Sequence, residues 1–182
     1  TWNRIKKLYS SNVRRAGHFS QSVAIYKNRI LIGEPSNNWT PDITKAYIFE
    51  RDTSGVWNEV QNIFPMPNYL FGEEVALNDS FVIVADPHDE FDEYGLNQLD
   101  RSGSVRFYKM NGNNWGLHQK VVPLDRKDDE ATFGRELHLH KNSIIISAQN
   151  AENPYVYQGN TYYTSNGSAY YYDLDPISGL WD

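Results

Sequence analysis

The sequence contains no cysteine among its 182 residues. This absence excludes disulfide bonds, thiolate nucleophiles and zinc or iron–sulfur sites built on cysteine. No apolar run reaches the roughly 18 residues that a membrane-spanning helix needs, and the first residues do not resemble a signal peptide. We therefore expect this segment not to insert into a membrane.

Basic residues are few, because 17 Lys and Arg face 23 Asp and Glu and leave a net charge of -6 at pH 7. A nucleic-acid surface needs clustered Lys and Arg, so we expect no nucleic-acid partner. Recognisable catalytic motifs are missing as well, including G-x-S-x-G, the phosphate loop, the dinucleotide fingerprint and H-E-x-x-H. The sequence thus predicts a protein that is not an enzyme and names no catalytic residue.

Aromatic residues are abundant, at 14% of the chain, with 13 Tyr and 5 Trp. Aromatic and β-branched residues favour strands, and no segment shows the sustained period of 3.6 residues that amphipathic helices have. The length is that of one domain, and a hydrophobic content of 40% can supply an ordinary core. We therefore predict one all-β domain.

Four sequence features recur three times in the same order, which indicates a repeat protein. The first is a Phe-Gly-like pair that precedes a short strand, at Phe19-Ser20, Phe71-Gly72 and Phe133-Gly134. The second is an apolar run after an Asn-containing turn, at 30–32, 81–84 and 144–146. The third combines a small residue with aromatics, at 45–49, 103–108 and 167–172. The fourth is a Trp-led polar segment, at 2–8, 57–63 and 115–121.

Each repeat predicts a four-stranded antiparallel meander, because turn residues separate its consecutive strands. The apolar second strand is expected to be covered on both faces, and the charged Trp-led strand is expected at an edge. Meanders repeated at this spacing describe the blades of a β-propeller. The predicted single segment, 1–182, has an outer strand at 1–10 and blades at 11–66, 67–124 and 125–182, the last with an incomplete fourth strand.

These features together resemble the FG-GAP repeat of integrin α-subunit propellers. The similarity includes Phe71-Gly72 and a Gly-Ala-Pro-like corner, which reads Gly33-Glu34-Pro35 in the first copy and Ala85-Asp86-Pro87 in the second. Only Ala148 remains of the corner in the third copy, and Ser20 replaces Gly in the first. The resemblance covers essentially the whole chain and implies a propeller scaffold for extracellular recognition, without indicating a particular ligand.

Three blades are fewer than the roughly 4 to 8 of ordinary propellers, and we expect a ring of about six or seven. Two explanations are open. The remaining blades belong to a longer chain of which this is an excerpt, or a second subunit completes the ring, with segment 2–8 of one chain finishing the last blade of another. The sequence favours the excerpt, because 179–182 stops within the fourth feature.

An acidic connection follows the second apolar run and contains Asp86, Asp89, Asp92 and Asp100. Calcium prefers 6 to 8 oxygen ligands, so these residues are the candidate metal site and calcium the candidate ion. Their spacing matches no established calcium loop, however, and a solvated acidic loop is the interpretation we favour. The hairpin turns that carry calcium in FG-GAP repeats have only three or four residues here, and no other cofactor is expected.

A tyrosine-rich connection at 153–167 lengthens the third repeat and contains Tyr155, Tyr157, Tyr162 and Tyr163. Exposed Tyr beside Asn and Ser forms an adaptable surface for proteins or sugars. The alternative is an ordered loop whose rings pack on the neighbouring blade. These four tyrosines are the candidate ligand-binding residues.

Three N-glycosylation triplets begin at Asn38, Asn78 and Asn166, each in a predicted turn or loop. They favour an extracellular or cell-surface location. Together with the repeat, they predict a non-enzymatic recognition, adhesion or assembly module that binds a protein or glycan partner through its loops. Two alternatives are open: a propeller domain of, or accessory to, a glycan-directed hydrolase, and a structural spacer in a filament or other large assembly.

Overall fold

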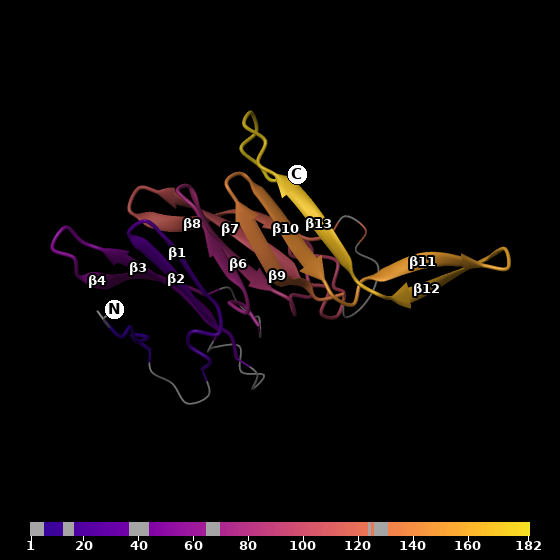
Figure 1. Cartoon of the computed structure of the whole chain (residues 1–182), viewed down its shortest axis with the longest axis horizontal. Coiled ribbons are helices and arrows are strands. Elements are labelled where there is room, and N and C mark those ends of the chain that lie inside the picture. Colours follow the sequence, from indigo (N-terminus) through magenta and orange to yellow (C-terminus); the bar gives the residue numbers. More distant parts are fainter. Residues whose placement is uncertain (1–5, 13–16, 37–43, 65–69, 124, 126–130) are drawn as a thin grey trace, which may run out of the picture.

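The computed structural model describes residues 6–12, 17–36, 44–64, 70–123, 125 and 131–182. Every regular element within these ranges is a β-strand, which confirms the all-β prediction (Figure 1). All strand pairs are antiparallel, and the described residues contain no helix that could cross a membrane.

Two four-stranded meanders form as the repeat predicts. The first sheet has the order β1 (Val23–Tyr26), β2 (Arg29–Glu34), β3 (Lys45–Arg51), β4 (Trp57–Ile63). The second sheet has the order β5 (Val75–Leu77), β6 (Phe81–Asp86), β7 (Ser104–Asn111), β8 (Asn114–Val121). The last strand of each sheet is the Trp-led segment, and it lies at an edge.

The third sheet contains three strands, β9 (Phe133–His140), β10 (Ser143–Ala148) and β13 (Ser168–Asp173), with β10 in the middle. A fourth strand is only begun, where Trp181 forms an isolated bridge with Leu174. Between β10 and β13 the chain makes a separate two-stranded hairpin, β11 (Glu152–Tyr157) and β12 (Asn160–Ser165). This hairpin, called the Tyr hairpin below, projects away from the sheets (Figure 1).

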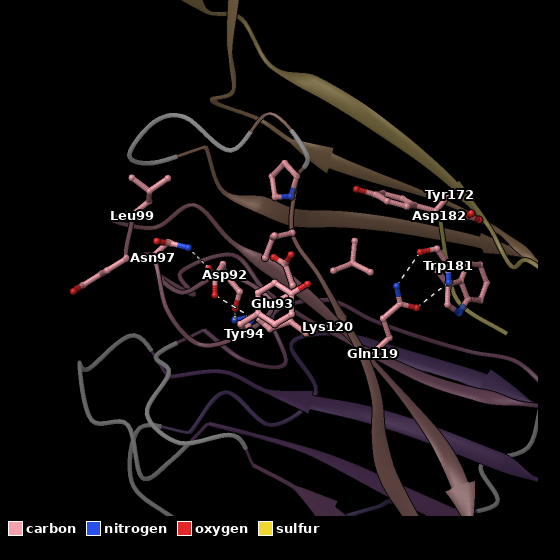
Figure 2. Close-up of a pocket in the computed structure, with 14 residues that line it drawn as sticks. Asp92, Glu93, Tyr94, Asn97, Leu99, Gln119, Lys120, Tyr172, Trp181 and Asp182 are labelled. Carbon is pink, nitrogen blue, oxygen red and sulfur yellow. Dashed lines mark hydrogen bonds between the residues drawn. The ribbon is translucent and has the colours of Figure 1, made fainter. Parts of the chain in front are cut away.

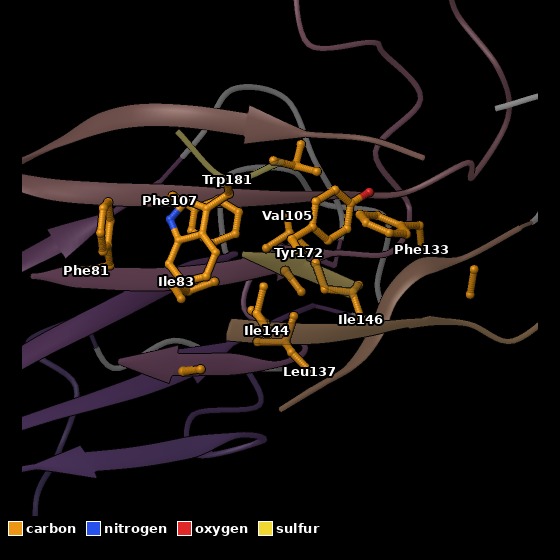
Figure 3. Packing of buried hydrophobic residues seen from close by; sticks show 14 of the residues in the cluster. Phe81, Ile83, Val105, Phe107, Phe133, Leu137, Ile144, Ile146, Tyr172 and Trp181 are labelled. Atoms are coloured by element: carbon orange, nitrogen blue, oxygen red, sulfur yellow. The ribbon is translucent and has the colours of Figure 1, made fainter. Parts of the chain in front are cut away.

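Two apolar clusters hold the sheets together, one on each face of the second sheet. Val82 and Val84 of β6 lie in the cluster shared with the first sheet, while Phe81 and Ile83 lie in the cluster shared with the third. Figure 3 shows the second cluster, where the Trp181 ring stacks on Phe107 at a centroid distance of 4.9 Å. Both faces of β6 are thus covered, so all six of its residues are buried.

The prediction that all three apolar runs are covered on both faces is wrong for β10. Ile144 and Ile146 are buried against the second sheet, but the side chain between them, Ile145, is 47% exposed. The reason is that none of the described residues forms a sheet on the outer face of the third sheet. A charge at position 145 is therefore not expected to collapse the fold.

The Phe-Gly pairs mark the places where the backbones of consecutive sheets approach each other. Gly72 has a φ of +92°, and a Cβ there would lie 2.7 Å from the carbonyl oxygen of Lys45 in the first sheet. Gly134 has a φ of +93° and lies against Ala85 of the second sheet. Ser20 keeps the left-handed conformation, with a φ of +75°. No described sheet lies on its outer side, so its side chain is tolerated there.

A glutamine clamp joins each Trp-led strand to the next repeat. Gln61 of β4 donates its amide to the carbonyl of Trp115 at 2.9 Å and accepts the N–H of Trp115 at 2.7 Å. Gln119 of β8 binds Trp181 in the same way, at 2.9 and 2.8 Å. Both glutamines stand four residues after the Trp of their own strand, so the clamp is a property of the repeat that the sequence analysis missed.

The N-terminal segment, residues 6–12, takes the corresponding place beside the first sheet. Lys6 stands four residues after Trp2 in the sequence and donates its ammonium group to the carbonyl of Trp57 at 2.7 Å. Residues 6–12 nevertheless form no strand, although an outer strand was predicted at 1–10, of which 1–5 fall outside the described residues. A strand needs a neighbour to pair with, and the described part of the chain supplies none here.

Candidate binding surface

The Tyr hairpin, predicted as a tyrosine-rich connection, is a regular antiparallel pair in which Tyr155 lies opposite Tyr162. Its two-residue turn consists of Gln158 and Gly159, with φ angles of +48° and +79°. Positive φ at both central residues is the requirement of a type I′ turn, which matches the twist of the flanking strands. The signal that the sequence analysis missed was this Gln-Gly pair between two alternating tyrosine segments.

All four candidate tyrosines are exposed, but they do not share one face. Because side chains alternate along a strand and opposite residues share a face, Tyr155, Tyr157 and Tyr162 lie on one face, with Tyr163 and Val156 on the other. Tyr155 and Tyr162 stack at 5.5 Å between ring centroids. Each face therefore presents aromatic area to solvent, and the alternative in which the rings pack on a neighbouring blade is not what the structure shows.

The base of the Tyr hairpin is tied to the third sheet by Asn153. Its amide donates to the side-chain oxygen of Asn166 at 2.7 Å and to the carbonyl of Gly167 at 2.8 Å, while its own oxygen accepts from Ser168 at 3.1 Å. The backbone closes the base between Ala151 and Gly167 at 3.1 Å. These hydrogen bonds fix the base of the Tyr hairpin, so its exposed tyrosines belong to a regular hairpin that is attached to the third sheet.

A groove of about 1020 Å³ lies between β8, the connection after β6 and the C-terminal residues (Figure 2). Aromatic side chains of Tyr94, Tyr172 and Trp181 contribute to its walls, and Lys120 and Asp92 contribute polar groups. This mixture of apolar surface with a few polar groups is common in ligand sites.

Two polar side chains of the groove, Asp92 and Lys120, are engaged within the chain, whereas the carboxylates of Glu93 and Asp182 are exposed in its lining. Asp92 accepts the backbone N–H of Tyr94 at 3.0 Å and of Leu96 at 2.7 Å. Lys120 donates to the carbonyls of Phe91 and Asp92, each at 2.8 Å, and burial lowers its pKa. These two side chains therefore hold the connection after β6 in place beside β8.

Buried charges fix the start of the acidic connection to the second sheet. Arg106 binds Asp89 at 2.6 Å and reaches Asp86 at 3.4 Å, and Lys120 binds Asp89 at 2.8 Å. Burial, reinforced by the charge of Asp89, raises the pKa of Asp86 to about 7, although Arg106 opposes the shift. Burial also pushes the pKa of Asp89 upward, but Arg106, Lys120 and Ser104 outweigh it and the pKa is lowered.

The four aspartates proposed as a metal site do not form one ligand set. Asp86 and Asp89 share Arg106, Asp92 closes a turn, and Asp100 lies at the surface beside Arg101 at 3.3 Å. In the described ranges no group of three or more His, Asp or Glu side chains is placed to hold a metal ion. Carboxylates that already neutralise Arg and Lys do not fit the oxygen cage that calcium prefers.

The glycosylation candidates differ in their accessibility. Asn38 lies outside the described residues. Asn78 accepts the N–H groups of Ser80 and Phe81 and donates its own amide to the carbonyl of Lys141 at 2.8 Å. A glycan on that nitrogen would replace one of its two hydrogens and would lie beside the third repeat. Asn166 is exposed at the base of the Tyr hairpin, where its side-chain oxygen accepts from Asn153.

Comparison with protein-family models and with curated proteins found no match to this chain. The resemblance to FG-GAP repeats therefore rests on the four ordered sequence features. In the structure, a close approach at Gly and a glutamine clamp each recur from one repeat to the next.

Proposed function

We propose that the chain is a non-enzymatic recognition module of a cell surface or extracellular assembly, which binds a protein or glycan partner through the Tyr hairpin. One observation carries this proposal: the Tyr hairpin exposes aromatic side chains on both faces, and the hydrogen bonds of Asn153 fix its base to the third sheet. An isolated two-stranded hairpin buries little of its own surface and is marginal in water. A partner that covers the tyrosines would account for their exposure.

The arrangement of the sheets supports FG-GAP-like propeller blades as the scaffold. The first strands of consecutive repeats lie next to each other, since β5 contacts both β1 and β9. Each sheet packs on its neighbour through one apolar cluster. Blades around a common axis make this kind of contact, with their first strands innermost. Further blades of a longer chain, or a second subunit, would complete the ring.

The polar chemistry of the groove supports binding rather than hydrolysis. A glycan-directed hydrolase needs one carboxylic acid and one carboxylate facing the same cleft. Asp86, the acid with the strongly raised pKa, is completely buried, and Asp92, which lines the groove, accepts two backbone N–H groups. Neither of these two side chains is available to a sugar, so a hydrolytic role would have to use the remaining carboxylates of the groove, Glu93 and Asp182.

The composition of the Tyr hairpin favours a protein partner. Segment 153–165 has no charged side chain and combines Tyr with Asn, Thr, Ser and Gln. Tyr supplies rigid contact area at low entropic cost and the small polar residues adapt their hydrogen bonds, as in antibody binding loops. A sugar ligand would use the same rings, so the test includes both classes.

Excision of the hairpin provides the test. Residues 152–166 are replaced by a short Gly-Ser linker between Ala151 and Gly167, which the structure already brings together. Labelled protein is applied to an array of secreted and surface proteins and to a glycan array. We expect binding by the full chain that is lost on excision and reduced at least about tenfold by Tyr155→Ser with Tyr162→Ser. Equal binding by the excised chain would refute the proposal.

A further inference from the structure

The Tyr hairpin has two outer edges, and the position of its turn decides which backbone groups point out from them. In a two-residue type I′ hairpin, the residues that flank the turn exchange both of their backbone hydrogen bonds, and every second pair after them does the same. Tyr157 and Asn160 are therefore a hydrogen-bonded pair. The next pair, Val156 and Thr161, directs its N–H and C=O groups outward, and so does every second pair towards the base.

The β11 edge is protected against a further strand. Its outward positions are 152, 154 and 156, and the first two are occupied by Glu152 and Pro154. Pro154 has no N–H, so a strand added on this side would lack one ladder hydrogen bond. A charged side chain on an edge strand also discourages pairing with another chain. Both features therefore oppose pairing along β11.

The β12 edge has no such protection. None of its six residues, Asn160–Ser165, is proline or charged, and all six are exposed. Its outward backbone groups belong to positions 161, 163 and 165, and each of these residues has an N–H. In the described part of the chain, β12 pairs with β11 alone. The hairpin projects away from the three larger sheets, so they do not cover this edge (Figure 1).

The other edge strands that the structure describes are short, charged or partly paired. β1 has four residues and β5 has three. β4 contains Glu59, β8 contains Lys120 and β9 contains Arg135. Beside β13, the bridge between Leu174 and Trp181 begins another pairing. Short and charged edges are how natural sheets avoid pairing with other chains, so the uncharged six-residue edge of β12 is an exception.

We propose that β12 pairs with β12 of a second copy of this chain, antiparallel about a two-fold axis, and that the two hairpins form one four-stranded sheet. The inference deepens the proposed recognition function, and rests on it, because it names the partner of the Tyr hairpin. It uses the hairpin alone, so it does not depend on how many blades the ring has.

Two-fold symmetry makes a second copy a matching occupant. In an antiparallel pair the opposite residues exchange N–H and C=O groups, so the edge of one strand is complementary to the same edge of a rotated copy. Outward positions must face outward positions, which places the axis at Tyr162 or at Tyr163. In both registers Thr161 exchanges hydrogen bonds with the other copy, with Tyr163 when the axis lies at Tyr162 and with Ser165 when it lies at Tyr163.

The side chains of the hairpin suit pairing with a copy of itself. At the axis a tyrosine lies opposite its own copy, which is a favourable aromatic cross-strand pair. Segment 153–165 has no charged side chain, so two copies do not repel each other along the strand, although each chain has a net charge of -6. A partner recognised through charge would need charged side chains on this edge, and β12 has none.

Protection of the β11 edge limits the size of the assembly. Each hairpin offers one edge, so the joined sheet has a β11 strand on both sides and the assembly stops at two copies. A sheet of at least three strands has the independent stability that a single hairpin lacks in water. The contact adds only one six-residue strand per copy, so we expect a dimer that dissociates on dilution.

Sedimentation velocity of the 182-residue chain over a concentration series tests the dimer. Proline at the two members of one cross-strand pair provides the matched comparison. Thr161→Pro removes an outward N–H from the β12 edge and is expected to weaken dimerisation at least about tenfold, because the symmetric contact loses this donor in both copies. Val156→Pro removes the opposite N–H from the β11 edge and should leave dimerisation unchanged.

Amide hydrogen exchange of the wild-type chain gives a measurement that needs no substitution. Thr161 and Val156 both direct their N–H groups outward in the single chain, so both amides should exchange rapidly in dilute solution. At high protein concentration the Thr161 amide should exchange more slowly, whereas the Val156 amide should not change. The hairpin lies outside the apolar clusters of the sheets, so thermal melts of both proline variants should match the wild type.

A chain that is monomeric at every concentration would overturn the proposal. So would a dimer that is unaffected by Thr161→Pro, that persists after excision of the hairpin, or in which the Thr161 amide exchanges as rapidly as that of Val156. The array test separates this failure from a failure of the proposed function. A monomeric chain that binds an array protein only when it has its hairpin would exclude the second copy and leave the recognition function standing.

Discussion

Gln61 and Trp115 are 54 residues apart in sequence, yet the side-chain amide of one satisfies both backbone groups of the other, at 2.9 and 2.7 Å. The ring of Trp115 is buried in the cluster between the first two sheets. The side-chain amide of Gln61 therefore fixes the register between two consecutive repeats, at the position where the Trp115 ring packs in the core.

Replacement of Gln61 by Ala should destabilise the protein by about 1 to 3 kcal/mol, because it leaves a backbone N–H and a carbonyl without their partner at a partly buried site. Gln98→Ala removes an exposed amide that binds Glu90 and should change stability by less than about 0.5 kcal/mol. Urea unfolding followed by tryptophan fluorescence measures both variants. Equal stability of the two would show that the clamp is not a stabilising element.

Aspartate at two matched isoleucine positions should have very different effects. Ile83 is fully buried between sheets, so Ile83→Asp should cost more than about 4 kcal/mol or prevent folding. Ile145 is 47% exposed, so Ile145→Asp should cost less than about 1 kcal/mol in the single chain. Circular dichroism melts at low protein concentration compare the two. A collapse of the Ile145 variant would mean that its outer face is covered.

The free energy of unfolding should fall as the pH rises between the unfolded-state and folded-state pKa values of Asp86. Its pKa in the folded protein is about 7, above the 3.8 of an ordinary aspartate. Between these values the folded state holds a proton that the unfolded state releases, so stability decreases with rising pH, by an amount of order 1 to 3 kcal/mol. The lowered pKa of Asp89 acts oppositely, because its contribution is present above the ordinary aspartate pKa and is lost as the pH falls through the lower folded-state pKa.

The Asp86→Asn variant isolates this contribution, because its side chain does not titrate. Unfolding free energies of wild type and variant, measured by urea at intervals from pH 4 to 8, should diverge in slope across this range, with the variant flatter. Parallel curves would show that Asp86 is ionised throughout and that another group accounts for any pH dependence.

Alanine at Gly72 should destabilise the protein by about 2 kcal/mol or more, because it combines a positive φ with a Cβ placed 2.7 Å from the carbonyl oxygen of Lys45. Gly112→Ala separates these effects, since Gly112 has a φ of +60° but no atom within 4 Å of an added Cβ. Its cost should be limited to about 1 kcal/mol of backbone strain. Similar losses at both sites would show that the close approach of the sheets is unimportant.

Local patterns in the sequence determined the strands and their order within a repeat. The Trp-led strand over 57–63 has the bounds of β4, and the apolar run at 81–84 lies within β6. Alternating side chains, Asn-containing turns and aromatic runs act over a few residues, and these signals are present in the chain itself. The Gln158-Gly159 turn is a local signal of the same kind, since a two-residue pair with Gly lies between two tyrosine-containing segments.

Only the tertiary structure decided which faces are covered and which charges are buried. Ile83 and Ile145 sit in equivalent apolar runs, yet one is enclosed and the other is half exposed, because a described sheet follows the second repeat and none follows the third. Asp86 belongs to an acidic stretch whose sequence predicts a solvated loop, but it is the last residue of the buried strand β6, where its carboxylate lies 3.4 Å from Arg106. Burial and pairing depend on neighbours more than 15 residues away along the chain, and local sequence patterns do not specify those neighbours.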